Sequence, residues 1–170
     1  MRKVGRKMAG EDWTLRSGTA PGADTAFEEG ADELKGAKEI YLPCDGYRGK
    51  HSSEPGIYVP QKMDNYQQGI EIARQFHPDY SSLGEYREHI IRDGYQILGQ
   101  NLVTPCQLVI CWTVDGCTSA KERTARTGGT GQAISIADSR NIPIYNLKLP
   151  RHREKIAAWL ENRITISSLK

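Results

Sequence analysis

Strand-like and helix-like segments alternate along this chain, and this alternation limits its fold more than any other feature. β-Strands are predicted at four short apolar runs, over residues 13–17, 37–43, 107–113 and 142–147. Helices are predicted where apolar residues recur at helical spacing, from residue 23 and over 61–76, 83–98, 132–140 and 152–163. Because strands that alternate with helices pair in parallel through crossovers, we predict an α/β fold with an open, mostly parallel sheet.

The run QLVICWT, residues 107–113, is the most strand-like segment of the chain. A continuous apolar run of this kind is typical of a strand buried on both faces of a parallel sheet, so a central strand is predicted here, with helices on both faces. The aromatic residues of the predicted strands are expected to pack in the core rather than to stack on a ligand. They are Trp13, Tyr41, Trp112 and Tyr145.

Length and composition indicate one globular domain over residues 1–170. The chain is 38% hydrophobic and 26% charged, which is ordinary for a folded protein. Its 23 basic and 21 acidic residues give a net charge of +2. This balance is too even to favour nucleic-acid binding through bulk electrostatics.

Neither a membrane span nor a metal site is predicted. No apolar run approaches the roughly 18 to 20 residues that a bilayer requires, and the start MRKVGRKMAG lacks the apolar stretch of a signal peptide, so a cytoplasmic protein without a membrane partner is expected. The four cysteines form no close Cys-x-x-Cys pair and the four histidines are scattered. Reduced cysteines are therefore expected, with no metal and no cofactor.

Two glycine-rich turns, each leading into a predicted helix, are the candidate binding site. A helix N-terminus offers unpaired backbone N–H groups and a positive dipole end, and glycine allows the backbone to come close to a phosphate. The first turn supplies Ser17, Gly18, Thr19, Gly22, Ala23 and Asp24, and the second supplies Gly128, Gly129, Thr130, Gly131 and Gln132. Thr113, Asp115 and Gly116 end the predicted strand between them. Together they predict an anionic, nucleotide-like ligand, with Asp24 capping its helix or holding a ribose hydroxyl.

Four motifs carry a resemblance to the SLOG superfamily, the Rossmann-like group that includes the LOG enzymes and DprA. RSGTAPGAD, residues 16–24, resembles that group's RSGGAxGAD signature. CWTVDG, TGGTGQAISIA and IPIYNL are similar to its small, phage-type nucleotide-binding members. The resemblance covers about residues 13–147. It implies a Rossmann-like fold, a nucleotide or nucleotide-derived ligand, and a homo-oligomer.

The same resemblance bears on catalysis. LOG enzymes carry a PGGxGTxxE motif whose glutamate assists cleavage of the N-glycosidic bond. In this chain Ile134 and Ser135 stand where the paired glutamates would be, so the phosphate-binding glycines are kept and the carboxylate is lost. We therefore expect a sensor or sequestering protein without strong catalysis, and no catalytic residue is assigned.

Two other functions stay open at this point. The first is a nucleotide N-glycosidase in which Asp115, Glu85 or Glu88 replaces the lost glutamate and Arg87 or Arg92 clamps the anion. The second is a DprA-like binder of single-stranded DNA, which would need a basic stripe and salt-sensitive affinity.

Members of the group usually begin with a strand that ends in a Gly-Ser-Arg-like turn, whereas Met1 opens directly on a predicted helix. Unpaired strand edges in the middle of a sheet are costly. We therefore expect either that the natural protein starts upstream of Met1 or that residues 13–17 pair directly with 107–113.

Self-association is the first testable prediction. The resemblance implies dimers, and the predicted helix over 83–98 carries Tyr86, Ile90, Ile91, Tyr95 and Ile97, an apolar surface that a partner copy could cover. Light scattering at micromolar concentration is expected to give at least twice the chain mass of 19.0 kDa. A mass equal to that of one chain would contradict the prediction.

Overall fold

The computed structural model describes residues 1–169 as a mixed α/β protein with parallel strands, which confirms the predicted fold class. The chain divides into two compact units, Met1–Pro105 and Cys106–Lys170. Whether both units belong to one domain stays a prediction.

The first unit contains a three-stranded parallel sheet in the order β1-β2-β3. Its strands are β1 (Leu15–Ser17), β2 (Lys38–Tyr41) and β3 (Ile57–Tyr58), and its helices are α1 (Arg2–Gly10), α2 (Ala23–Asp32), α3 (Tyr66–Phe76) and α4 (Arg87–Leu98). Leu15 pairs with Lys38, and Ile40 pairs with Ile57. Short 3₁₀ turns cover Tyr47–Gly49, Pro60–Lys62, Tyr80–Ser82 and Gly84–Tyr86. The strand β3 was not predicted, because two residues are too few to show a pattern.

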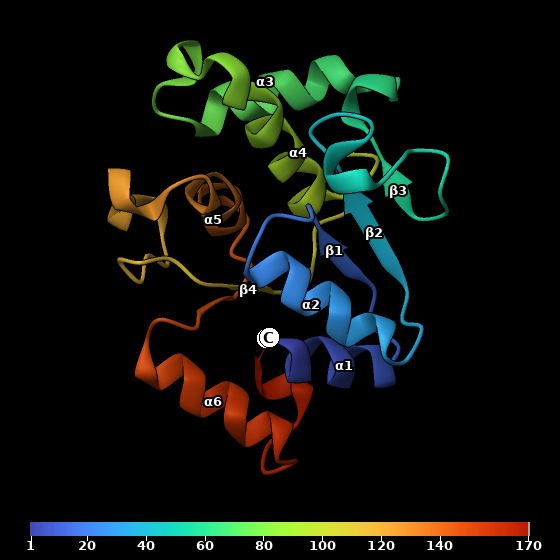
Figure 1. Cartoon of the computed structure of the whole chain (residues 1–170). Coiled ribbons are helices and arrows are strands. Elements are labelled where there is room, and N and C mark those ends of the chain that lie inside the picture. Colours follow the sequence, from blue (N-terminus) through green and yellow to red (C-terminus); the bar gives the residue numbers. More distant parts are fainter. Residues whose placement is uncertain (170) are drawn as a thin grey trace. The chain divides into compact units, whose positions relative to one another are not determined.

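Helix α1 lies against α2, and two glycines bring their backbones together (Figure 1). A Cβ atom at Gly5 would overlap the carbonyl oxygen of Phe27, and one at Gly30 would overlap the carbonyl oxygen of Arg2. No side chain separates the helices at these two positions. The contact therefore requires glycine on both helices.

Helix α4 is buried within the chain along most of its length. Ile91 and Tyr95 have no exposed surface, and Ile90 and Ile97 are each 4% exposed, whereas Tyr86 is 71% exposed. The apolar surface of this helix is thus already covered by the chain itself. The structural argument for self-association through 83–98 was therefore wrong, and oligomerisation stays a prediction that rests on the resemblance alone.

The second unit contains a parallel pair of strands and two helices. They are β4 (Val109–Cys111), β5 (Ile144–Asn146), α5 (Thr130–Ser139) and α6 (Pro150–Leu160), with 3₁₀ turns at Ala120–Glu122, Ala125–Thr127 and Ile166–Leu169. Val109 pairs with Ile144. Cys111, Cys117 and Ile134 form a buried cluster against which Val109 and Ile144 pack.

Burial of the segment 107–113 on both faces was predicted wrongly. Cys111 and Thr113 are buried, but Trp112 between them is 46% exposed. Because successive side chains of a strand point to opposite faces, the chain covers one face at this point and leaves the other open. Tyr41 and Tyr145 do pack in the core as predicted, at 0% and 6% exposure.

The strands at 13–17 and 107–113 have different partners. β1 pairs with β2, and β4 pairs with β5. The two segments belong to different units, so their direct pairing stays a prediction. Within residues 1–169, no helix has both the length and the apolar character needed to cross a membrane.

A Gly30→Ala substitution tests the contact between α1 and α2. Alanine normally favours a helix, but here its Cβ would overlap backbone, so we expect the free energy of unfolding to fall by about 1–3 kcal/mol. Urea denaturation measures the change. Gly10→Ala is the matched control, because a Cβ there would meet only the flexible end of Leu34 at 3.2 Å. Equal stabilities of the two variants would contradict the proposed contact.

Candidate functional site

In the second unit, the loop that follows β4 is fastened to the end of β5 by one buried amide. Asn146 donates from Nδ2 to Thr113 Oγ1 at 2.7 Å and to the carbonyl oxygen of Cys117 at 2.8 Å. Its Oδ1 accepts from the amide of Thr113 at 3.3 Å. Thr113, a predicted site residue, is thus a support of the loop. Asn146 was missed, although a polar residue inside the apolar run IPIYNL was a usable signal.

Asp115 connects this loop to the segment that leads into α5. Its Oδ2 accepts from Thr127 Oγ1 at 2.6 Å and from Thr124 Oγ1 at 2.8 Å. Hydrogen bonds to the ionised form, above all the one from Thr127, hold the pKa of Asp115 well below its usual range. Asp115 is therefore an ionised residue that positions the second glycine turn.

The second glycine turn presents unused backbone donors. Gly128 has a φ of +66°, which favours glycine, and α5 begins two residues later at Thr130. In the described part of the chain, the amides of Gly128, Gly129 and Thr130 have no acceptor within hydrogen-bonding distance. A Cβ atom at Gly128 or Gly129 would meet nothing within 4 Å. Three N–H groups at a helix N-terminus thus lack an acceptor, and both glycines are exposed, an arrangement that suits an anion.

The other two predicted residues of this turn are inside the helix. The amide of Gly131 donates to the carbonyl oxygen of Gly128 at 3.1 Å, and that of Gln132 donates to Gly129 at 3.0 Å. Gln132 has no exposed surface. Both residues support the turn from within rather than face a ligand.

An open pocket of about 320 Å³ lies beside Asp115. It is lined by Asp115, Gly116, Cys117, Thr118, Glu122, Leu149 and Arg151. Glu122 Oε2 accepts from both the amide and the hydroxyl of Thr118 at 2.8 Å, and the hydrogen bond from the Thr118 amide is the main cause of its lowered pKa. The pocket therefore combines two ionised carboxylates with the guanidinium of Arg151. Asp115 and Gly116 were predicted site residues, whereas Thr118, Glu122 and Arg151 were missed.

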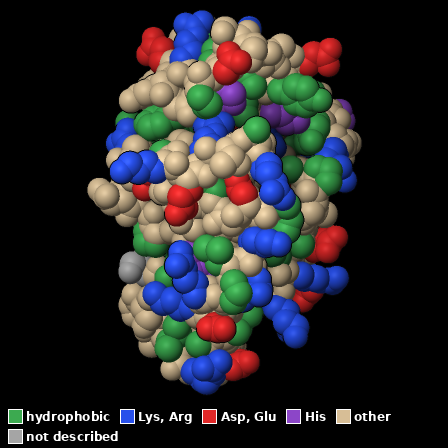
Figure 2. All heavy atoms as spheres, turned by 90° about the vertical axis from the view of Figure 1, so that its left-hand side faces the viewer, with side chains coloured by type: hydrophobic (Ala, Val, Ile, Leu, Met, Phe, Trp, Pro, Cys, Tyr) green, Lys and Arg blue, Asp and Glu red, His purple; other side chains and the backbone are tan. Residues whose placement is uncertain are grey.

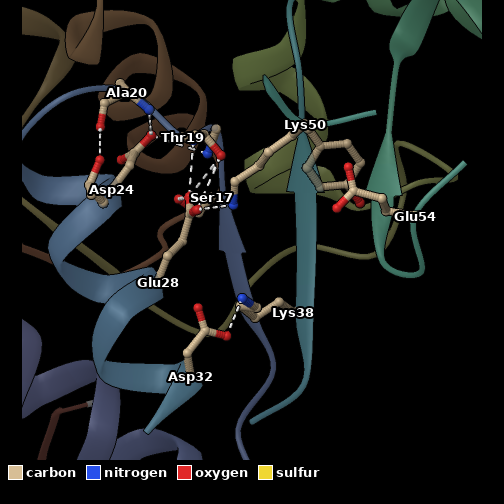
Figure 3. A network of polar contacts seen from close by, with 12 residues as sticks. Ser17, Thr19, Ala20, Asp24, Glu28, Asp32, Lys38, Lys50 and Glu54 are labelled. Atoms are coloured by element: carbon tan, nitrogen blue, oxygen red, sulfur yellow. Dashed lines mark hydrogen bonds and ion pairs between the residues drawn. The ribbon is translucent and has the colours of Figure 1, made fainter. Parts of the chain in front are cut away.

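In the first glycine turn, which belongs to the first unit, the donors of residues 17–20 are occupied. Glu28 of α2 accepts from Ser17 Oγ at 2.6 Å, from the amide of Thr19 at 3.0 Å and from Thr19 Oγ1 at 3.1 Å (Figure 3). Lys50 reaches the same carboxylate from the opposite side at 2.8 Å. Glu28 is only 4% exposed, so this ion pair is largely shielded from water.

Asp24 binds two further amides of this turn. Its Oδ2 accepts from the amides of Gly18 and Ala20, each at 3.1 Å. Burial raises the pKa of Asp24 despite these hydrogen bonds. The amides of Gly18, Thr19 and Ala20 are thus bound to carboxylates of the chain itself, whereas those of residues 22–24, at the start of α2, have no acceptor in the described part of the chain. Gly22, with a φ of +100°, precedes the first residue of α2, Ala23.

Arg92 also contacts the first turn from inside the unit. It is 6% exposed, and its Nη1 donates to the carbonyl oxygen of Gly18 and, at 3.5 Å, to that of Tyr41. A Cβ atom at Gly18 would overlap this guanidinium. Glycine at position 18 is therefore required by the approach of Arg92, which ties together the ends of β1 and β2.

The predicted site residues fall into two groups that belong to different units. Asp115, Gly116 and residues 128–132 lie together in the second unit, and residues 17–24 lie with Arg92 in the first. That both groups form one site stays a prediction. Within residues 1–169, no three His, Cys, Asp or Glu side chains are grouped so that they could hold a metal ion.

Comparison of the chain with protein-family models, with curated proteins and with solved structures found no match in any of the three. The resemblance to the SLOG superfamily therefore rests on the four sequence motifs.

A Glu28→Gln substitution tests the network at the first turn. The neutral amide cannot replace the carboxylate opposite Lys50 and its three other donors, so we expect the free energy of unfolding to fall by about 2–3 kcal/mol in urea denaturation. The control is Glu29→Gln on the same helix. The Glu29 side chain is 55% exposed and lies 3.8 Å from Arg2, and its replacement is expected to change stability by less than about 0.5 kcal/mol. A Glu28→Gln variant as stable as the control would contradict the structural role of the network.

Proposed function

We propose that this protein binds a nucleotide or nucleotide-derived small molecule through its second unit, with the phosphate at the second glycine turn. The observation that carries the proposal is the set of unused amides at Gly128, Gly129 and Thr130. Three such donors and the positive end of the α5 dipole favour a phosphate group without any side-chain cation.

The pocket beside this turn supports a nucleotide rather than a simple anion. Asp115 and Glu122 would repel a second anionic group, but their carboxylates are good acceptors for hydroxyl and amino groups. A ligand that fits this charge pattern carries phosphate at one end and hydrogen-bond donors at the other. The ribose and base of a nucleotide provide such donors.

The first turn contributes less to this proposal. Asp24 and Glu28 already accept the hydrogen bonds of residues 17–20, and their carboxylates would repel an anion at the remaining amides of residues 22–24. We therefore assign the phosphate to the second turn and a structural role to the first.

Binding without strong catalysis is the form of the proposal that these residues favour. Ile134 is fully buried in the cluster with Cys111 and Cys117, and Ser135 Oγ donates to the carbonyl oxygen of Gly131 at 2.8 Å. Neither side chain is free to assist cleavage of a glycosidic bond. Asp115 remains ionised and bonded to two hydroxyls, which makes it unsuitable as a proton donor.

Binding of single-stranded DNA is not favoured. On the face drawn in Figure 2, acidic side chains stand among the basic ones. A strand-binding groove requires a continuous basic track along the backbone of the nucleic acid.

A Gly129→Val substitution tests the phosphate site. Gly129 has helical angles (φ −58°, ψ −34°) and open space around it, so the fold is expected to stay intact. The added side chain crowds the three amides, so calorimetry with nucleoside 5′-monophosphates is expected to show affinity reduced about tenfold to a hundredfold. Ser139→Val at the far end of α5 is the control.

Two results would contradict the proposal. Unchanged affinity in Gly129→Val would place the phosphate elsewhere. Chromatographic detection of free base released from a nucleoside monophosphate by the unmodified protein would replace binding with N-glycosidase activity.

A further inference from the structure

Trp112 is an exposed aromatic residue of the second unit that has no role in the proposed phosphate site. Its side chain is 46% exposed although it directly follows the apolar strand β4. Val114, two residues later, is 40% exposed. Trp112 therefore presents an exposed apolar surface at the carboxyl end of β4, and Val114 belongs to the turn that follows, in which the amide of Gly116 donates to the carbonyl oxygen of Thr113 at 3.2 Å.

This surface adjoins the pocket. Lys148 joins the two, because its ammonium lies 6.0 Å from the centre of the Trp112 ring and its Cγ would lie 3.7 Å from a Cβ at Gly116, a pocket-lining residue. Asp115 also lines the pocket and lies three positions after Trp112, so their Cα atoms are at most about 11 Å apart.

The ring of Trp112 is accessible to a planar ligand. Lys148 stands at the outer limit of about 6 Å for a cation–π contact, so it holds the ring weakly. A large aromatic side chain exposed beside a polar pocket is suited to stacking on a base, whose π-face every nucleobase provides.

We propose that Trp112 is the stacking platform for the nucleobase of the ligand, and that the ligand class is therefore a base-bearing nucleotide rather than a sugar phosphate. This inference rests on the proposed function of the second glycine turn. The phosphate binds the amides of residues 128–130, the sugar lies over the pocket at Asp115, and the base stacks on Trp112.

The experiment is calorimetry of the full chain with two kinds of probe. One is the set of 5′-monophosphates of adenosine, guanosine, cytidine and uridine, and the other is ribose 5-phosphate, which lacks a base. Trp112→Ala is expected to weaken binding of the best monophosphate about tenfold or more and to leave ribose 5-phosphate unaffected. Trp112→Phe, which keeps an aromatic ring, is expected to retain most of the affinity. Val114→Ala, which removes the exposed apolar side chain of the neighbouring turn, is the matched control and is expected to change the affinity for neither probe.

Fluorescence supplies a readout that a merely structural role would not produce. The monophosphate is expected to quench tryptophan emission in the unmodified protein, and this quenching is expected to disappear in Trp112→Phe while binding persists. Equal affinities of the unmodified protein for ribose 5-phosphate and the best monophosphate would contradict the proposed stacking of the base on Trp112. So would an unchanged monophosphate affinity in Trp112→Ala, provided that Gly129→Val weakens binding. If the unmodified protein binds neither probe, both the proposed nucleotide binding and the proposed role of Trp112 are contradicted.

Discussion

The hydrogen bonds that Asp115 accepts from Thr127 and Thr124 are the interaction on which the second unit depends. They join the loop after β4 to the residues directly before the second glycine turn. Without them, neither the pocket nor the position of the three free amides would be defined, because the intervening segment contains only 3₁₀ turns and loop. Asn146 supports the same loop from the neighbouring strand. The carboxylate of Asp115 and the side-chain amide of Asn146 thus hold the second glycine turn in place, and the groups of that turn proposed to bind the ligand are backbone amides.

The two glycine turns look alike in the sequence but differ in what their donors do. In RSGTAPGAD, the following helix carries Asp24 and Glu28, which fold back onto the turn. In TGGTGQAISIADS, the first carboxylate after the turn is Asp138, near the far end of α5, where its Oδ2 accepts from Ala120. The first turn therefore has two carboxylates of its own helix beside its amides, whereas the second turn has none. This distinction was present in the sequence, because the first helix carries acidic residues at positions 24 and 28, whereas the second helix carries none before Asp138.

Much of the fold was predictable because it depends on local patterns. The strands β1, β2, β4 and β5 and the helices α2 to α6 all lie in or overlap segments whose apolar periodicity indicated them. The exposure of Trp112 was not predictable, since a continuous apolar run does not say which face of a strand the rest of the chain covers. The same limit applies to Arg151 and Glu122. Their place in the pocket depends on how the loops after β4 and β5 pack, and no local pattern encodes that packing.

The backbone conformation of Thr19 limits which substitutions the first glycine turn can accept. Its φ of +58° lies in the left-handed region, which is costly for a β-branched residue, and the signature that the motif resembles has glycine at this position. Glu28 offsets that cost by accepting from both the amide and the hydroxyl of Thr19. Positions 19 and 28 are therefore coupled. A chain with glycine at 19 would need the carboxylate at 28 less, whereas a chain with threonine at 19 depends on it.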